Sequence, residues 1–179
     1  MLRRFRPWLI GAVVACAAVA AGFWFGLHQR QAPVDPDSQS ALERARFQNT
    51  TGETRKLADL AGRPALLNFW ATWCAPCLAE LPLLDRTHRE RGRDLQIIGI
   101  AVDSPEAVHR FQSKVPLALD VWIADANALD LLPKLGNRAG GLPFSVLVDG
   151  QGRVLNRHLG ALTEASLPAF LAPALPPPK

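Results

Sequence analysis

Cysteine is scarce in this sequence of 179 residues, and its scarcity excludes two classes of small protein. The three cysteines are Cys16, Cys74 and Cys77. A domain held by a disulfide framework needs more pairs, and a loop closed between positions 74 and 77 adds little stability. A structural zinc site needs four ligands, usually from a second Cys-x-x-Cys or a closely spaced histidine pair, and the sequence has neither. We therefore expect no metal site.

Net charge is nearly absent outside the N-terminus. Residues 1–30 contain no acid, and the other 16 basic residues of the chain balance its 16 acidic ones. The formal charge of +4 therefore comes from four arginines near the N-terminus: Arg3, Arg4, Arg6 and Arg30. A nucleic-acid-binding domain needs clustered positive charge, so we predict no nucleic-acid partner.

The one long apolar run lies at the N-terminus. Residues 8–27 carry no charge, and about 20 such residues suffice to span a bilayer as a helix. Three arginines precede the run and Arg30 alone closely follows it, which predicts an N-terminus in the cytoplasm and a domain on the periplasmic side. Removal of a signal peptide and acylation at Cys16 are alternatives, although the run continues past both cleavage points. We expect residues 1–28 to anchor the chain in the inner membrane.

Composition divides the remaining chain into a linker, a domain and a tail. Residues 29–45 are polar and contain two prolines, which is typical of a linker. Residues 46–172 form the predicted domain, whose length suits a single core. Residues 173–179 contain four prolines, so they cannot form a helix, and we expect a disordered tail.

Apolar strands alternate with helices in the predicted domain. A Thr51-Gly52 turn within residues 47–60 predicts an N-terminal hairpin. Strands are predicted over 65–70, 95–102, 117–123, 144–148 and 154–159, and helices over 75–91, 104–114, 127–135 and 163–171. Strands joined by helices in this way indicate the α/β class. The order is that of a thioredoxin-like fold with an N-terminal β-hairpin extension and a central αβ insert.

The tetrapeptide Cys74-Ala75-Pro76-Cys77 lies between a buried strand and a helix. Two thiols at this spacing can form a disulfide and reopen it, which is the chemistry of a dithiol oxidoreductase. We expect Cys74 at the helix N-cap, where the helix dipole lowers its pKa and makes it the exposed nucleophile. Cys77, one turn inside, is then the resolving thiol. Trp73 flanks the nucleophile, and its indole suits core packing and substrate binding equally well.

Glu80 follows Cys77 by three residues and shares its helical face. A carboxylate near a buried thiol can take the thiol's proton. The alternative is a solvated surface glutamate that interacts with the helix dipole. The spacing alone leaves both interpretations open.

Leu142-Pro143, just before the strand at 144–148, is the second candidate site. In the thioredoxin arrangement, a proline at this point is cis, faces the cysteines and exposes backbone for pairing with an extended substrate. The alternative is an ordinary loop proline. Position relative to the cysteines favours the first interpretation. We therefore predict a substrate-binding site of five residues: Trp73, Ala75, Pro76, Leu142 and Pro143.

Residues 68–82 and 141–149 together resemble the TlpA/ResA family of membrane-anchored thiol-disulfide oxidoreductases. The resemblance extends over residues 47–171. It implies that Cys74 and Cys77 are catalytic, that Pro143 is cis and that Glu80 tunes the thiols.

One position departs from ordinary thioredoxins. Those proteins carry a buried aspartate in the strand before the cysteines, where this chain has Asn68. Asparagine cannot take a proton at neutral pH. Glu80 would then be the remaining carboxylate close to the dithiol.

The predicted function is that of an extracytoplasmic thiol-disulfide oxidoreductase acting mainly as a reductase. The resemblance implies protein disulfide substrates in cytochrome c maturation or copper-site assembly, and a membrane thiol reductase as electron donor. We expect a monomer without metal or organic cofactor. One alternative is a metallochaperone holding Cu(I) on both thiolates. The other is a thiol peroxidase, which normally has a threonine three residues before its cysteine, where this chain has Ala71.

Overall fold

The computed structural model describes residues 36–124 and 130–175. The predicted membrane anchor and the first part of the predicted linker lie outside these ranges. Within them, no helix is both long and apolar enough to cross a bilayer.

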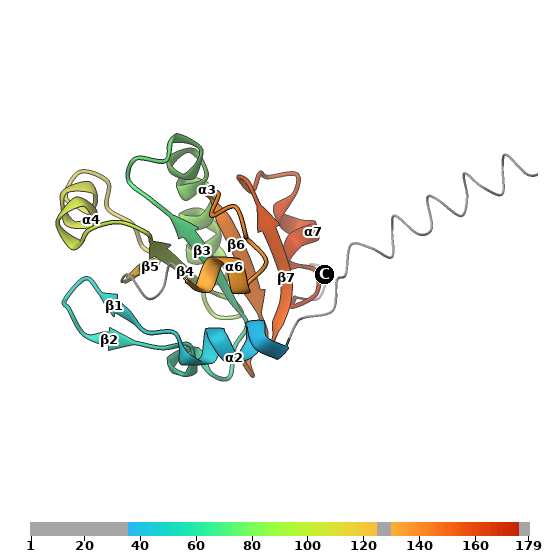
Figure 1. Cartoon of the computed structure of the whole chain (residues 1–179). Coiled ribbons are helices and arrows are strands. Elements are labelled where there is room, and N and C mark those ends of the chain that lie inside the picture. Colours follow the sequence, from blue (N-terminus) through green and yellow to red (C-terminus); the bar gives the residue numbers. More distant parts are fainter. Residues whose placement is uncertain (1–35, 125–129, 176–179) are drawn as a thin grey trace, which may run out of the picture. The chain divides into compact units, whose positions relative to one another are not determined.

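A seven-stranded mixed sheet forms the centre of the domain (Figure 1). The strands follow the order β2-β1-β5-β4-β3-β6-β7, with β3 parallel to β4 and β4 parallel to β5. All other pairs are antiparallel. The strands are β1 (Phe47–Asn49), β2 (Thr54–Arg55), β3 (Ala65–Trp70), β4 (Gln96–Ala101), β5 (Asp120–Ala124), β6 (Phe144–Val148) and β7 (Val154–Leu159).

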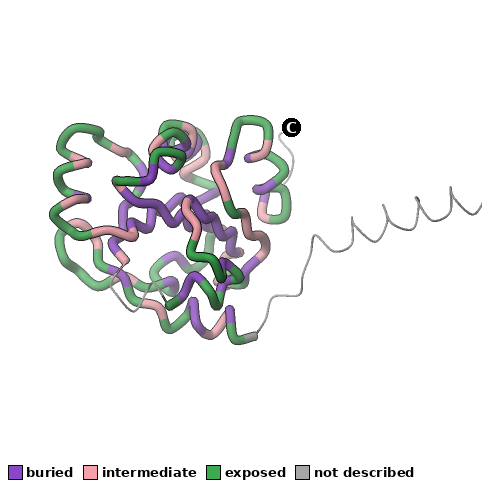
Figure 2. The backbone as a smooth tube through the Cα atoms, turned by 45° about the horizontal axis from the view of Figure 1, so that its top comes forward, coloured by how far each residue is buried: buried purple, intermediate pink, exposed green. Residues whose placement is uncertain are grey.

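Two apolar clusters cover the two faces of this sheet, which gives three layers. The first cluster joins the sheet to α3 (Ala75–Arg91), α4 (Pro105–Gln112) and α7 (Leu167–Leu171). The second joins it to α2 (Pro36–Arg44), the 3-10 helix η1 (Leu57–Leu60) and α6 (Leu131–Lys134). The central strands are accordingly buried, whereas the outer turns are exposed (Figure 2). These layers and the strand order confirm the predicted α/β thioredoxin-like fold.

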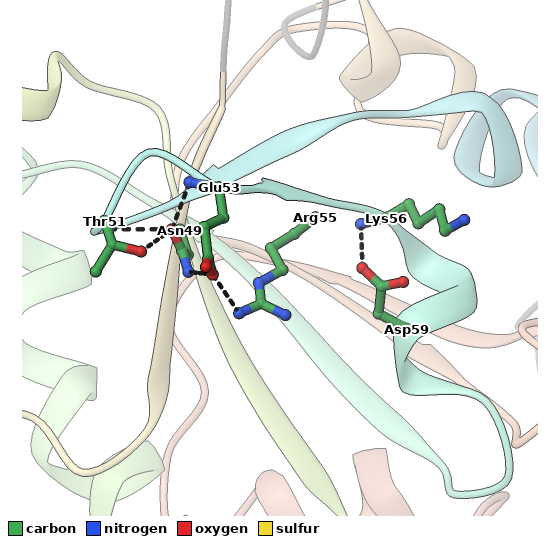
Figure 3. A network of polar contacts seen from close by, with 6 residues as sticks. All are labelled: Asn49, Thr51, Glu53, Arg55, Lys56 and Asp59. Carbon is green, nitrogen blue, oxygen red and sulfur yellow. Dashed lines mark hydrogen bonds and ion pairs between the residues drawn. The ribbon is translucent and has the colours of Figure 1, made fainter.

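The predicted N-terminal hairpin is present as β1 and β2, and one asparagine side chain organises its turn (Figure 3). The Asn49 Oδ1 accepts from the backbone N–H groups of Thr51 at 3.0 Å and Glu53 at 2.8 Å. The Asn49 Nδ2 donates to the Glu53 carboxylate at 2.7 Å. Asparagine is favoured in turns because its side chain can replace a backbone partner in this way. β1 also pairs with β5, so the hairpin extends the main sheet.

The linker prediction is wrong for residues 36–44, which form α2. Leu42 is fully buried, and the Ser38 hydroxyl donates to the Lys134 carbonyl oxygen at 2.5 Å. The polar composition of this segment concealed a short helix with one apolar edge that packs on the sheet. The domain therefore includes residues assigned above to the linker.

The packed chain also extends further than predicted at the C-terminus. Leu175 is 9% exposed, and its backbone N–H donates to the Leu171 carbonyl oxygen at 3.1 Å. The turn after α7 buries this leucine against the first cluster. The remainder of the predicted tail lies outside the described residues.

Candidate active site

The two cysteines lie at the junction of β3 and α3. Cys74 is the N-cap of α3, and its Sγ accepts from the Cys77 backbone N–H at 3.3 Å. The two residues form a disulfide with an S–S distance of 2.02 Å and a Cα–Cα distance of 5.3 Å. Cys74 is 6% exposed and Cys77 is 0% exposed. The predicted N-cap position is confirmed. Cys74 is less exposed than expected, but it is the one of these two cysteines that the surface reaches.

The surface around Cys74 combines apolar and small side chains. Trp73 is 70% exposed, which excludes core packing as its role. Ala75 and Pro76 are exposed in the first turn of α3. Three predicted substrate-binding residues therefore surround the cysteine that the surface reaches.

Glu80 is buried, with 3% of its surface exposed, so the interpretation as a solvated surface residue is wrong. Its Oε1 accepts from the Asn68 Nδ2 at 2.8 Å, and its Oε2 accepts from the Leu162 backbone N–H at 2.6 Å. Burial raises the pKa of the Glu80 carboxyl, and these two hydrogen bonds offset part of that rise. The result is an acid held one turn from Cys77 whose charged form is disfavoured.

Asn68 connects Glu80 to Ser145 in β6. It faces Ser145 in the pairing of β3 with β6, and its Nδ2 donates to the Ser145 Oγ at 3.0 Å as well as to Glu80. The Asn68 Oδ1 is buried and has no hydrogen-bond partner among the described residues. Sequence reasoning identified Asn68 as a departure from thioredoxins but not as the donor that holds Glu80.

The Leu142–Pro143 peptide bond is cis, as predicted. The pairing of Phe69 with Phe144 brings the start of β6 next to the end of β3, where the cysteine loop begins. The Pro143 carbonyl oxygen accepts from the Gly160 N–H at 2.9 Å, and Leu142 is half-buried. The two predicted substrate-binding segments therefore meet at one end of the sheet.

Asp103 holds Thr72, two residues before Cys74, a contact that the sequence analysis missed. Its Oδ2 accepts from the Thr72 backbone N–H at 3.0 Å and from the Thr72 hydroxyl at 2.5 Å. Burial opposes the charge of Asp103, but hydrogen bonds from Thr72 and Ser104 keep its pKa below the usual range. The available signal was that Thr72 and Asp103 follow neighbouring parallel strands, whose carboxyl ends meet at one edge.

Metal-ligating side chains do not gather near the cysteines or elsewhere in the described ranges. No group of three or more histidine, cysteine, aspartate or glutamate side chains there could hold a metal ion.

Comparisons with known proteins agree with this geometry. Residues 39–172 match the AhpC/TSA family. The thiol-disulfide oxidoreductase ResA of Halalkalibacterium halodurans is 28% identical over 176 residues, which cover 96% of each chain. A thiol:disulfide interchange protein DsbE from Chlorobium tepidum shares the fold with a TM-score of 0.58 and 27% identity over 73% of this chain and 92% of its own.

A second solved structure gives the same result. The exposed lipoprotein thioredoxin of Streptococcus pneumoniae has a TM-score of 0.61 and 25% identity, covering 71% of this chain and 96% of its own. The family match spans most of the chain, and the relatives share the sulfur chemistry that the Cys74–Cys77 disulfide displays. The chain therefore belongs to the AhpC/TSA family and is a thiol-disulfide oxidoreductase of the ResA/DsbE type.

Proposed function

We propose that this enzyme is an extracytoplasmic reductase of protein disulfides in which Cys74 attacks the substrate and Cys77 resolves the intermediate. One observation carries the proposal: the N-capping Cys74 is the cysteine that retains exposure, while Cys77 and Glu80 are buried behind it on α3. This order of exposure supports a separate role for each sulfur.

The first step uses the Cys74 thiolate. The helix N-terminus and the Cys77 N–H stabilise its charge. The thiolate attacks one substrate sulfur, a bond forms between Cys74 and that sulfur, and the substrate disulfide breaks. The second substrate sulfur leaves as a thiolate and takes a proton from water.

The second step requires Cys77 to lose a proton where water has little access. Glu80 accepts this proton. Burial raises the pKa of its carboxyl, which brings that pKa closer to the pKa of a thiol and makes the proton transfer less unfavourable. The Cys77 thiolate attacks the Cys74 sulfur, and the remaining substrate sulfur departs with the proton that Glu80 returns. Both substrate sulfurs are then reduced, and the enzyme holds its disulfide.

Exposed apolar side chains support a protein substrate. Trp73, Val115 and Leu159 are the exposed large apolar residues of the described ranges. A Cβ built on Gly141 would lie 3.2 Å from a Leu159 methyl carbon, so Leu159 adjoins the loop before the cis bond. Leu142 has no backbone hydrogen bond to other described residues. An extended segment pairing with Leu142 would therefore have an apolar contact with Leu159.

The N-terminal run and the relatives support a location and a set of partners. The apolar residues 8–27 suit a membrane anchor, and one structural relative is a lipoprotein thioredoxin. We propose that the domain faces the periplasm and is reduced again by a membrane thiol reductase. Apocytochrome c cysteines and copper-site assembly factors are the substrates that the family resemblance favours.

The test is to trap substrates in cells with the full chain carrying Cys77→Ser. Without the resolving thiol, Cys74 should accumulate mixed disulfides with extracytoplasmic proteins, which mass spectrometry identifies after reductive release. Cys74→Ser is the matched control and should trap none. Equal, empty results from both variants would falsify the proposal.

The same preparations test the two alternative functions. Rapid oxidation of Cys74 by hydrogen peroxide without trapped proteins would favour the peroxidase. Cu(I) bound by the reduced pair, lost on air oxidation and unaccompanied by insulin reduction, would favour the metallochaperone.

A further inference from the structure

Asn137 closes the loop that precedes the cis peptide bond. Its Nδ2 donates to the Gly141 carbonyl oxygen at 2.8 Å, and its Oδ1 accepts from the Gly141 N–H at 3.1 Å. Its backbone carbonyl oxygen also accepts from the Gly140 N–H at 3.1 Å. One planar amide therefore satisfies both backbone groups of Gly141, as a neighbouring strand would.

Asn137 is itself held firmly. Its side chain is buried, with 2% of the residue exposed, and its backbone N–H donates to the Leu132 carbonyl oxygen in α6 at 2.9 Å. A buried amide keeps such an orientation because any other would leave a donor or an acceptor without a partner. The loop is thereby tied to a helix that packs on the core of the sheet.

The loop has further attachments at the end of β7. Gly141 packs closely on the Leu159 side chain, since an added Cβ would lie 3.2 Å from it. The Pro143 carbonyl oxygen accepts from the Gly160 N–H at 2.9 Å. The residues before and after Leu142 are thus both fixed.

Leu142 lies between these attachments with no backbone hydrogen bond to other described residues. Its N–H and C=O directions are set by Gly141 and Pro143 before any substrate arrives. Such preorganisation strengthens binding because the substrate need not order the loop.

We propose that Asn137 is a positioning residue that fixes the Leu142 backbone at the angle required to pair with an extended segment beside the target disulfide. This inference rests on the proposed function, because it requires a substrate with a peptide backbone. A small disulfide without peptide bonds would make no use of the loop. Asn137 should therefore affect the binding of a protein substrate but not the exchange between sulfur atoms.

Asn137→Leu tests the proposal, because it keeps the side-chain size and removes both hydrogen bonds to Gly141. The reduced full-length enzyme is mixed with either insulin or hydroxyethyl disulfide, and single-turnover rates are measured against substrate concentration. We expect the half-saturating insulin concentration to rise about tenfold or more, with a small change in limiting rate. The rate with hydroxyethyl disulfide should stay within about twofold of the original value, since that reaction needs no loop.

Asn49→Leu is the matched control. It also removes side-chain hydrogen bonds that organise a turn, but in the β1–β2 hairpin at the other end of the strand order (Figure 3). We expect it to leave both disulfide reactions unchanged. A comparable rise in half-saturating insulin in this control would show that general loosening causes the effect, and it would overturn the inference.

Asn137→Asp keeps the shape and the acceptor for the Gly141 N–H but places a carboxylate oxygen against the Gly141 carbonyl oxygen, so it should raise half-saturating insulin in the same direction. It decides the question if Asn137→Leu does not fold. Unchanged insulin kinetics in the folded variants, or an equal loss with both disulfides, would overturn the inference alone. Wild-type enzyme that reduces hydroxyethyl disulfide but not insulin would overturn the proposed function and this inference together.

Discussion

Helix α3 carries two buried carboxylates, Glu80 near its start and Asp85 near its middle. They are 3% and 6% exposed. Both accept backbone N–H groups from distant segments: Glu80 from Leu162, and Asp85 from Ala118 at 2.5 Å and Leu119 at 3.1 Å. In burial and in backbone partners, the two acids are alike.

They differ in their side-chain partners. Asp85 forms a salt bridge with Arg89, one turn further along α3. Glu80 has the neutral amide of Asn68 and no salt bridge among the described residues. A cation balances the charge of Asp85, whereas burial raises the pKa of Glu80. We therefore propose different roles for two acids on one helix: Asp85 stabilises the fold, and Glu80 exchanges a proton beside the dithiol.

Asp85→Ala tests the structural role of Asp85, and we expect it to give the largest effect, a loss of stability. It leaves the Ala118 and Leu119 N–H groups without their acceptor and Arg89 without its partner. The free energy of unfolding should fall by about 3 kcal/mol. Urea unfolding of the oxidised protein measures this fall, and the single-turnover rate with hydroxyethyl disulfide should not change. A large rate loss with intact stability would contradict the division of roles.

Glu80→Gln tests the proposed proton transfer between Cys77 and Glu80. Glutamine keeps the size of the side chain but cannot accept the Cys77 proton, so resolution should slow about a hundredfold, or ~2.7 kcal/mol in activation free energy. Quenched reactions should show the Cys74–insulin adduct accumulating, with the initial attack unchanged. Resolution at the original rate would mean that Glu80 does not take the proton.

The sequence predicted the elements that carry the cysteines because their signals are local. β3 has the predicted bounds, since a short apolar run ends at the motif. The bounds of α3 also agree, because Cys74 caps it and Pro76 is tolerated in its first turn. β5 is different: it starts at Asp120 rather than at 117, because its pairing with Ile98 of β4 decides where the ladder begins.

The partners of Glu80 could not be predicted in the same way. Leu162 is 82 positions away, and its N–H reaches the carboxylate only after β7 has joined the sheet. The amide of Asn137 likewise bonds to Gly141 across a loop whose conformation has no periodic signal. Local patterns locate helices and strands, whereas these contacts depend on the assembled core.

The pH dependence of stability sharpens the comparison further. Because burial raises the pKa of Glu80 above its ordinary value of 4.5, the oxidised folded state binds that proton more tightly than the unfolded state does. The contribution of Glu80 is therefore fully present below pH 4.5 and is lost as pH rises through the folded pKa. Urea unfolding of wild type and of Glu80→Gln, measured from below pH 4.5 upward, isolates the contribution of Glu80.

Subtracting the free energy of unfolding of Glu80→Gln from that of wild type cancels the pH dependence that the other acids contribute to both proteins. Asp103 and Asp149 act in the opposite direction, because hydrogen bonds keep their pKa values low despite partial burial. The wild-type free energy of unfolding should fall relative to that of Glu80→Gln as pH rises. A constant difference, or one of opposite slope, would show that Glu80 gains no proton affinity on folding.

Arg89→Ala should give the smallest effect, and it tests whether the cation or the backbone contacts make Asp85 structural. The Arg89 side chain is 63% exposed, and exposed ion pairs contribute about 0.5 kcal/mol. Asp85 would keep its hydrogen bonds from Ala118 and Leu119. We therefore expect the free energy of unfolding to fall by about 0.5 kcal/mol, with the rate of disulfide exchange unchanged. In the double variant Asp85→Ala, Arg89→Ala, removing the arginine should add nothing further, because its partner is already gone. An additive loss would mean that Arg89 stabilises α3 without Asp85, and the salt bridge would then not distinguish Asp85 from Glu80.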